Sequence, residues 1–263
     1  MTMTAAMTIS MTTRQDAIAQ GEAEYAALLA MLHALAPEDW SRSTDCPAWT
    51  VREIVAHVNG AAEEAVRRRV QARHLLVAQT RDRKLPAVDS LSAQQVADRS
   101  GSTPADLVVE LARLGPAAPR ARSRVPGLVR SRPMPKDSGC LPGDTMGYLL
   151  DVIYSRDVWL HRVDISRATG CEMPVSHAEP AIVRQVVRDL SRGWTGRPFA
   201  LTLNGRVEGS WRVGQAGDDA GEVAVDTVAL CRLLSGRSDE TEPSYDGSDP
   251  ALPDRLRAAR VLF

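Results

Sequence analysis

The chain lacks the features that mark several common protein classes. Its 263 residues include only four cysteines, Cys46, Cys140, Cys171 and Cys231. None of them forms a C-x-x-C pair, which excludes a zinc ribbon and a dithiol redox motif. No apolar run approaches the roughly 20 residues that span a bilayer, and residues 1–13 lack the basic region and apolar core of a secretory signal. We therefore expect a soluble, cytoplasmic protein with reduced thiols and no membrane partner.

An excess of either charge is also missing. Lys plus Arg number 32 against 33 for Asp plus Glu, a formal net charge of -1, whereas a dedicated nucleic-acid binder is normally strongly basic. The basic run over residues 67–73 is therefore expected to be a solvated helix face. Neither a G-x-S-x-G turn nor a phosphate-binding glycine loop is visible, which argues against metal-free hydrolysis and nucleotide chemistry. Arginine heavily outnumbers lysine, a bias that indicates a high-GC bacterial genome.

Helical patterns dominate up to Gly170, where apolar residues recur at three- and four-residue steps. A capping box at Thr50 and Glu53 begins one of these helices. The expected helices span residues 14–35, 50–77, 90–99, 103–114 and 145–170. The segment 115–143, rich in Pro, Gly and Arg, predicts an irregular connection. Successive long helices indicate an all-helical bundle.

After Gly170 the pattern changes to that of a small α+β domain. An alternating strand over residues 199–203 ends at Asn204-Gly205, a strong hairpin signal. The remaining expected elements are a helix at 180–192, strands at 211–213 and 222–225, and helices at 227–234 and 253–261. The predicted organisation is a disordered tail (1–13), a helical bundle (14–172) and a C-terminal α+β domain (173–263).

The most informative stretch is the helix around Asp157. Apolar residues Met146, Leu150 and Ile153 form a stripe that continues into Asp157, His161 and Asp164. Polar groups at core positions are costly to bury unless they are paired or bind something. Asp157 and His161 lie four residues apart, so both can reach one metal ion. Taken alone, such a pair is more often a surface ion pair or a local hydrogen bond.

His57 supplies a third candidate ligand, on the apolar face of the helix that starts at Thr50. A lone histidine there is more often a core residue that is hydrogen-bonded to a neighbour. With Asp157 and His161 it completes a set of two histidines and one carboxylate. Three protein ligands leave an open position for water or substrate, as in catalytic zinc sites.

At these residues the chain resembles the mycothiol-dependent maleylpyruvate isomerase family, whose N-terminal half is a DinB-like metal-binding four-helix bundle. Three segments carry the resemblance: residues 46–57 (CPAWTVREIVAH), 156–164 (RDVWLHRVD) and 225–237 (VDTVALCRLLSGR). The resemblance implies a DinB-like bundle followed by a small α+β domain. It places the metal ligands on His57, Asp157 and His161, where the family pattern has Glu in place of Asp157.

The resemblance also implies the chemistry. The cofactors would be a divalent metal, zinc in the first place and nickel as the other choice, and the low-molecular-weight thiol mycothiol. The substrate would be a small unsaturated or electrophilic acid, and the reaction an isomerisation or a thiol transfer. Two alternatives stay open: a non-catalytic small-molecule-binding protein, and a DinB-like metal-dependent hydrolase. The chain would be a monomer or a homodimer.

Other residues near these motifs have candidate roles. Asp164 is placed to orient a ligand histidine, or alternatively to cap the helix or pair with Arg162 or Arg167. Arg232 and Arg237 are candidates for binding a substrate carboxylate, because a guanidinium offers a bidentate match. Trp49 and Trp159 are expected to pack in the core. Cys46 lies shortly before the helix that carries His57 and is a candidate to approach the site, although a buried structural cysteine is favoured.

Overall fold

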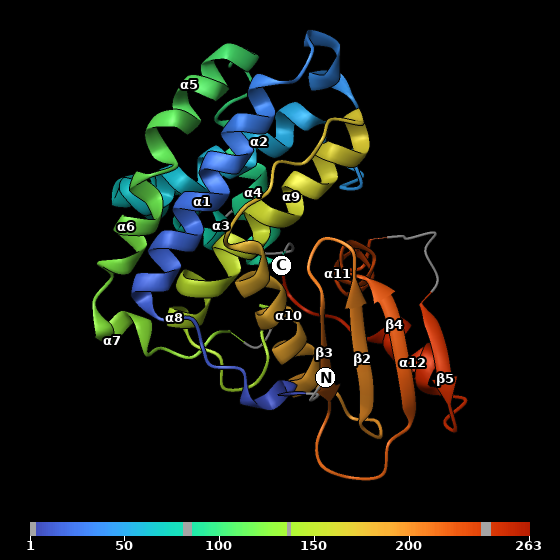
Figure 1. Cartoon of the computed structure of the whole chain (residues 1–263). Helices are drawn as coiled ribbons and strands as arrows, with labels where there is room; N and C mark the ends of the chain where they lie inside the picture. The colour runs from blue at the N-terminus through green and yellow to red at the C-terminus, as the bar shows by residue number, and fades with distance from the viewer. Residues whose placement is uncertain (1–3, 81–85, 136–137, 238–242) are drawn as a thin grey trace. The chain divides into compact units, whose positions relative to one another are not determined.

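The computed structural model describes residues 4–80, 86–135, 138–237 and 243–263. The chain divides into two compact units, one formed by residues 13–178 and the other by residues 1–12 together with 179–263. The first unit is helical and the second contains a five-stranded sheet (Figure 1). This confirms the expected fold class.

The helical unit is built on a few long helices with a common apolar core. Helices α1 (Arg14–His33), α2 (Val51–Val66), α5 (Pro104–Leu114) and α9 (Tyr154–Thr169) supply most of the core residues. Shorter elements complete the unit. They are η2 (Pro37–Ser41), α3 (Arg68–Thr80), α4 (Ala87–Ala97), α6 (Ala117–Ser123), α7 (Gly127–Arg130), α8 (Met146–Tyr148) and the π-helical turn η3 (Leu149–Ile153).

Local sequence signals explain how the two central helices begin and end. The capping box of α2 is present: the Thr50 backbone N–H donates to Glu53 Oε2 at 2.7 Å. Helix α9 ends at Gly170, whose φ of 74° lies in the left-handed region that glycine adopts without strain. These two helices carry the candidate ligands.

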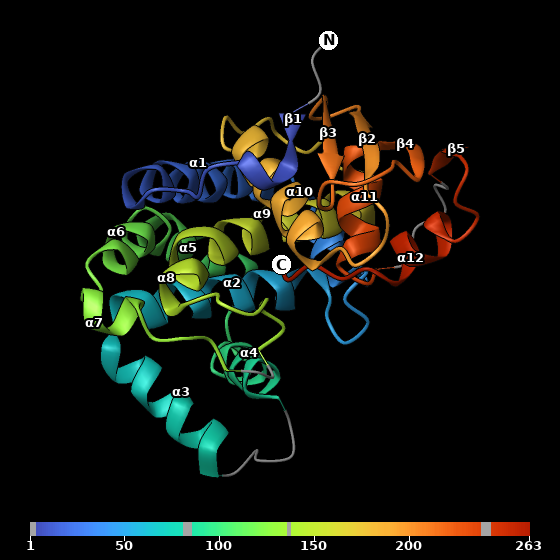
Figure 2. The same ribbon diagram turned by 90° about the horizontal axis from the view of Figure 1, so that it is seen from below.

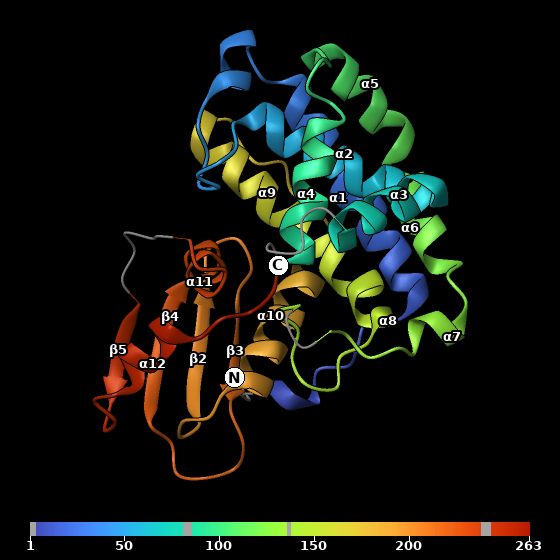
Figure 3. The same cartoon turned by 180° about the vertical axis from the view of Figure 1, so that it is seen from behind.

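Two parts of the helical unit differ from the sequence expectation. The helix expected over 50–77 is interrupted at Arg67, where φ and ψ of -116° and 88° leave the helical region. Helix α3 then runs in a new direction and packs against α4, which lies beside α2 (Figures 2 and 3). The segment 115–143 is not wholly irregular, because α6 and α7 form within it.

The second unit is a mixed sheet with strand order β1-β3-β2-β4-β5, which Figure 2 shows in sequence. Strands β2 (Phe199–Asn204) and β3 (Gly209–Val213) form the expected antiparallel hairpin, and β4 (Gly221–Asp226) runs parallel to β2. Strand β5 (Ser244–Gly247) was not expected. Helices α10 (Glu179–Gly193), α11 (Thr227–Leu234) and α12 (Leu252–Ala258) complete the unit.

The ends of the units differ from the expected boundaries. The tail expected to be disordered contributes strand β1 (Thr4–Ala5), which pairs with β3, and η1 (Ala6–Thr8). Residues 171–178 remain with the helical unit, because the Ser166 hydroxyl donates to the Cys171 carbonyl at 2.7 Å and Arg162 donates to the Pro174 carbonyl. The boundary therefore falls a few residues later than 172.

Candidate metal centre

The two central helices of the helical unit bring the three predicted ligands together. His57 lies on α2, and Asp157 and His161 lie one turn apart on α9. One ligand atom from each residue falls within 4.8 Å of the other two. His57 Nε2 lies 3.6 Å from Asp157 Oδ2, and His161 Nε2 lies 3.3 Å from Asp157 Oδ1. The structure therefore brings the three residues together, and their role as metal ligands stays a prediction.

Each histidine nitrogen lies at the spacing of a metal site from one oxygen of Asp157, His57 from Oδ2 and His161 from Oδ1. In a tetrahedral site with metal–ligand bonds of about 2.0–2.2 Å, neighbouring nitrogen and oxygen donors lie about 3.3–3.6 Å apart. His57 Nε2 is too far from Asp157 for a normal hydrogen bond, and its buried Nδ1 has no partner among the described residues. His57 is thus not a core histidine satisfied by its neighbours. The donor set and its spacing fit a divalent ion.

The charges within the set are strongly coupled. Burial disfavours the charged form of His161, but Asp157, Asp164 and Cys46 outweigh burial and hold the pKa of His161 well above its ordinary value. Burial likewise disfavours ionisation of Asp157, yet His161 and His57 hold the pKa of that carboxyl well below its ordinary range. Without a metal, the histidine proton and the carboxylate charge stabilise each other.

Asp164 lies behind His161 and is fully buried. Its Oδ2 lies 3.1 Å from His161 Nδ1 and 3.6 Å from Cys46 Sγ. A carboxylate only accepts hydrogen bonds, so the proton of the neutral imidazole lies on Nδ1 and the Nε2 lone pair faces Asp157. The two arginines weighed as partners for Asp164 contact other acids: Arg162 contacts Glu24 at 2.5 Å and Arg167 contacts Asp45 at 3.3 Å.

The loop that precedes α2 forms a further wall of the site. The Trp49 ring lies 4.9 Å from the His57 ring and 6.1 Å from the His161 ring, measured between centroids. Cys46 is half-buried and donates its thiol hydrogen to Asp164. Both residues pack against the core, as expected, and Cys46 also approaches the site, which was the alternative weighed for it. The contact of Trp49 with the two histidines was not expected. The position of Trp49 immediately before the helix that carries His57 was the available signal. Trp159, by contrast, is fully buried as expected.

Arg232 and Arg237 belong to the other unit. Arg232 is buried on α11, and the Arg237 backbone N–H donates to the Arg232 carbonyl at 3.0 Å. Their role in binding a substrate carboxylate remains a prediction. In the part of the chain that the structure describes, no helix has both the length and the apolar character needed to cross a membrane.

Comparisons with known proteins agree with this fold. Residues 22–166 match the family described as the mycothiol maleylpyruvate isomerase N-terminal domain. The crystal structure of the mycothiol-dependent maleylpyruvate isomerase is similar, with a TM-score of 0.57 and 16% identity over 94% of this chain and 98% of that one. A histidine-to-alanine mutant of that enzyme gives a TM-score of 0.55 and 15% identity over the same shares. No curated protein sequence matches significantly. The family match covers more than half of the chain, so the chain belongs to the mycothiol maleylpyruvate isomerase family and is an enzyme.

Proposed function

We propose that the chain is a metal-dependent enzyme that uses mycothiol to isomerise a small unsaturated acid, or to transfer the thiol to an electrophilic one. The observation that carries the proposal is the convergence of His57, Asp157 and His161 at donor spacing within this family's bundle. The similar structures are of a mycothiol-dependent maleylpyruvate isomerase. A maleylpyruvate-like cis-enedicarbonyl acid is therefore the substrate to test first.

The chain's own residues have distinct roles in this proposal. His57, Asp157 and His161 would hold the ion, zinc in the first place and nickel as the other choice. A bound zinc would lower the pKa of a coordinated thiol and so supply a thiolate nucleophile at neutral pH. Asp164 fixes the proton of His161 on Nδ1, which leaves Nε2 free to bind. Trp49 covers the histidine rings and limits access of water.

The two reactions differ only in the fate of the thiol. In an isomerisation, the sulfur adds to one carbon of the cis double bond and a proton to the other. Rotation about the resulting single bond is followed by loss of a proton from the second carbon and of the thiol from the first, which gives the trans acid. In a transfer, the carbon–sulfur bond and the added proton remain in the product. Both reactions need the same metal-bound thiol, so product analysis distinguishes them.

The shorter side chain of Asp157 is the main departure from the family pattern, which has Glu at this position. In the structure the Asp157 carboxylate still reaches both histidines, and the side chain is 22% exposed. The aspartate therefore preserves the donor set. The exposed fraction leaves an open side from which a thiol could approach the ion.

Steady-state assays with reduced mycothiol and maleylpyruvate test the proposal. The zinc-loaded protein should form the trans acid with mycothiol regenerated, or a mycothiol adduct, and His57→Ala should lose at least 100-fold in kcat/KM. His33→Ala, which changes an exposed histidine at the end of α1, should match the wild type. Turnover that needs no thiol would contradict the proposal and favour the hydrolase.

A further inference from the structure

A second candidate site lies in the helical unit, in a groove of about 1010 Å³. Helix α3 contributes Arg69, Val70 and Arg73 to its lining, and α5 contributes Val109 and Arg113. None of the candidate metal ligands lines this groove. Its volume is in the range of small-molecule sites. The groove includes part of the basic run that the sequence alone marked as a solvated helix face.

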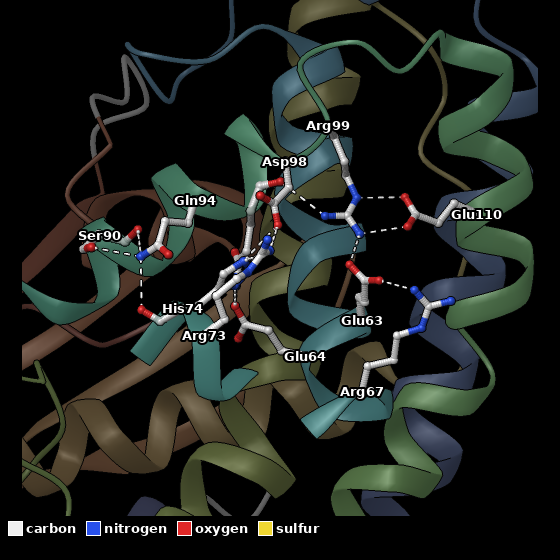
Figure 4. A network of polar contacts seen from close by, with 11 residues as sticks. Glu63, Glu64, Arg67, Arg73, His74, Ser90, Gln94, Asp98, Arg99 and Glu110 are labelled. Atoms are coloured by element: carbon white, nitrogen blue, oxygen red, sulfur yellow. Dashed lines mark hydrogen bonds and ion pairs between the residues drawn. The ribbon is translucent and has the colours of Figure 1, made fainter. Parts of the chain in front are cut away.

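Three of the four carboxylates that line the groove have cationic partners (Figure 4), and the fourth, Asp106, instead accepts hydrogen bonds from Thr103 at the start of α5. Glu63 contacts Arg99 at 2.9 Å and Arg67 at 2.6 Å. Glu110 receives two hydrogen bonds from Arg99, at 2.8 Å each. These contacts fix the Arg99 side chain, which is only 5% exposed. The charges of Glu63, Glu110 and Arg99 are therefore largely internal to the network.

Asp98, the third of these carboxylates, is also paired with neighbouring side chains. It contacts Arg73, and it lies 2.9 Å from Nε2 of His74, whose other ring nitrogen faces Glu64 at 2.6 Å (Figure 4). The network thus joins α2, α3 and the end of α4 into a rigid base. A rigid base preserves the shape of the groove when the groove is empty.

Two arginines that line the groove take no part in this charged network. Arg69 and Arg113 are exposed and have no acidic partner among the residues that the structure describes. Apolar side chains line the same groove, and Val109 is 71% exposed although it sits on a well-packed helix. The groove therefore offers unpaired guanidinium groups beside an apolar surface. This combination suits an anion with an apolar body.

We propose that the groove between α3 and α5 is a second binding site, separate from the metal centre, for a small organic carboxylate with an apolar body. Arg69 and Arg113 bind the carboxylate, and Val70 and Val109 contact the body. A polyanion is disfavoured, because the groove also contains four carboxylates that repel additional negative charge: Glu63, Asp98, Asp106 and Glu110. This inference goes beyond the proposed function and does not depend on it.

Titration of the whole, metal-free chain with phenylacetate, followed by the NMR shifts of backbone amides, tests the proposal. The shifts should be confined to α3, α5 and the end of α4, and the Arg69→Gln/Arg113→Gln variant should bind at least tenfold more weakly. Arg14→Gln/Arg124→Gln, which changes two exposed arginines elsewhere in the unit, should bind like the wild type. Benzyl alcohol, a neutral compound with the same ring, should bind at least tenfold more weakly than phenylacetate.

Three results would overturn the inference. The first is shifts that map only around His57 and His161. The second is equal phenylacetate affinity in the Arg69/Arg113 variant and the wild type. The third is equal affinity for phenylacetate and benzyl alcohol. Because the titration needs neither metal nor turnover, failure of the proposed enzymatic function would leave its outcome unchanged.

Discussion

Asp164 Oδ2 lies 3.1 Å from Nδ1 of His161, whose Nε2 faces Asp157 on the opposite side of the ring. Because Asp164 is fully buried, its hydrogen bond fixes both the tautomer and the orientation of the imidazole. The candidate metal centre therefore depends on a residue that is not itself among the three ligands.

The role of Asp164 can be tested with Asp164→Asn, which keeps the size of the side chain and removes its charge. We expect the affinity for zinc to fall about 10–100-fold, because outer partners of ligand histidines typically have effects of this size. Competition with a chromophoric chelator measures the affinity. Asp89→Asn, at an exposed position on α4, is the matched control, and unchanged zinc affinity in Asp164→Asn would show that Asp164 does not orient the ligand.

The metal-free protein should lose stability as the pH rises above neutrality. The pKa of His161 is raised on folding, so its contribution is complete below the unfolded value of about 6.5. Above that pH, the folded state holds a proton that the unfolded chain has released. The free energy of unfolding then falls by up to about 1.4 kcal/mol per pH unit until the folded pKa is passed.

Urea unfolding at several pH values measures this dependence. Asp157→Asn should reduce it, because Asp157 contributes most to raising the pKa of His161. The zinc-loaded protein should not show it, since a metal ligand must be a neutral imidazole. An identical pH dependence in the wild type and in Asp157→Asn would contradict the assigned coupling.

Trp49 should report metal binding directly. Its ring is close to both candidate histidine ligands, so a nickel ion bound there should quench its fluorescence. Titration with nickel is expected to lower the emission of the wild type and to have little effect on Trp49→Phe. Trp40→Phe, in η2, serves as the control and should retain the quenching. Equal quenching in Trp49→Phe would place the bound nickel elsewhere.

The charged network of Figure 4 predicts a large effect on stability. Arg99 is buried between Glu63 and Glu110. Its removal leaves Glu110 without its cationic partner and leaves Glu63 paired with Arg67 alone. Arg99→Ala should lower the free energy of unfolding by about 3–5 kcal/mol, as measured by urea denaturation. Arg124→Ala, at an exposed position, should change it by less than about 0.5 kcal/mol. Similar effects of the two substitutions would mean that the network contributes little.

Much of the fold follows from local signals in the sequence. The capping box at Thr50 and Glu53 places the start of α2, and the alternation before Asn204 places β2. The break at Arg67 carries no Gly or Pro and could not be foreseen from propensity. Strand β5 was missed because Ser244–Gly247 has no apolar alternation, and it forms by pairing with β4.

Only some residues of the candidate site could likewise be predicted from the sequence. His57, Asp157 and His161 could be named because helical periodicity places each on an apolar face. Cys46 and Trp49 could be placed near the site, because they precede the helix that carries His57. Their particular contacts depend on how the loop before α2 packs, which no local pattern encodes. Likewise, the pair of Glu24 and Arg162 is fully buried, although charged residues are normally expected at the surface.

Binding of one metal ion by His57, Asp157 and His161 is tested by elemental analysis of the purified chain after zinc reconstitution. The wild type should contain about one zinc per chain, His57→Ala and Asp157→Ala should contain almost none, and His33→Ala and Asp89→Ala should match the wild type. A wild type that stays free of metal, or ligand variants that keep the full amount, would contradict the account.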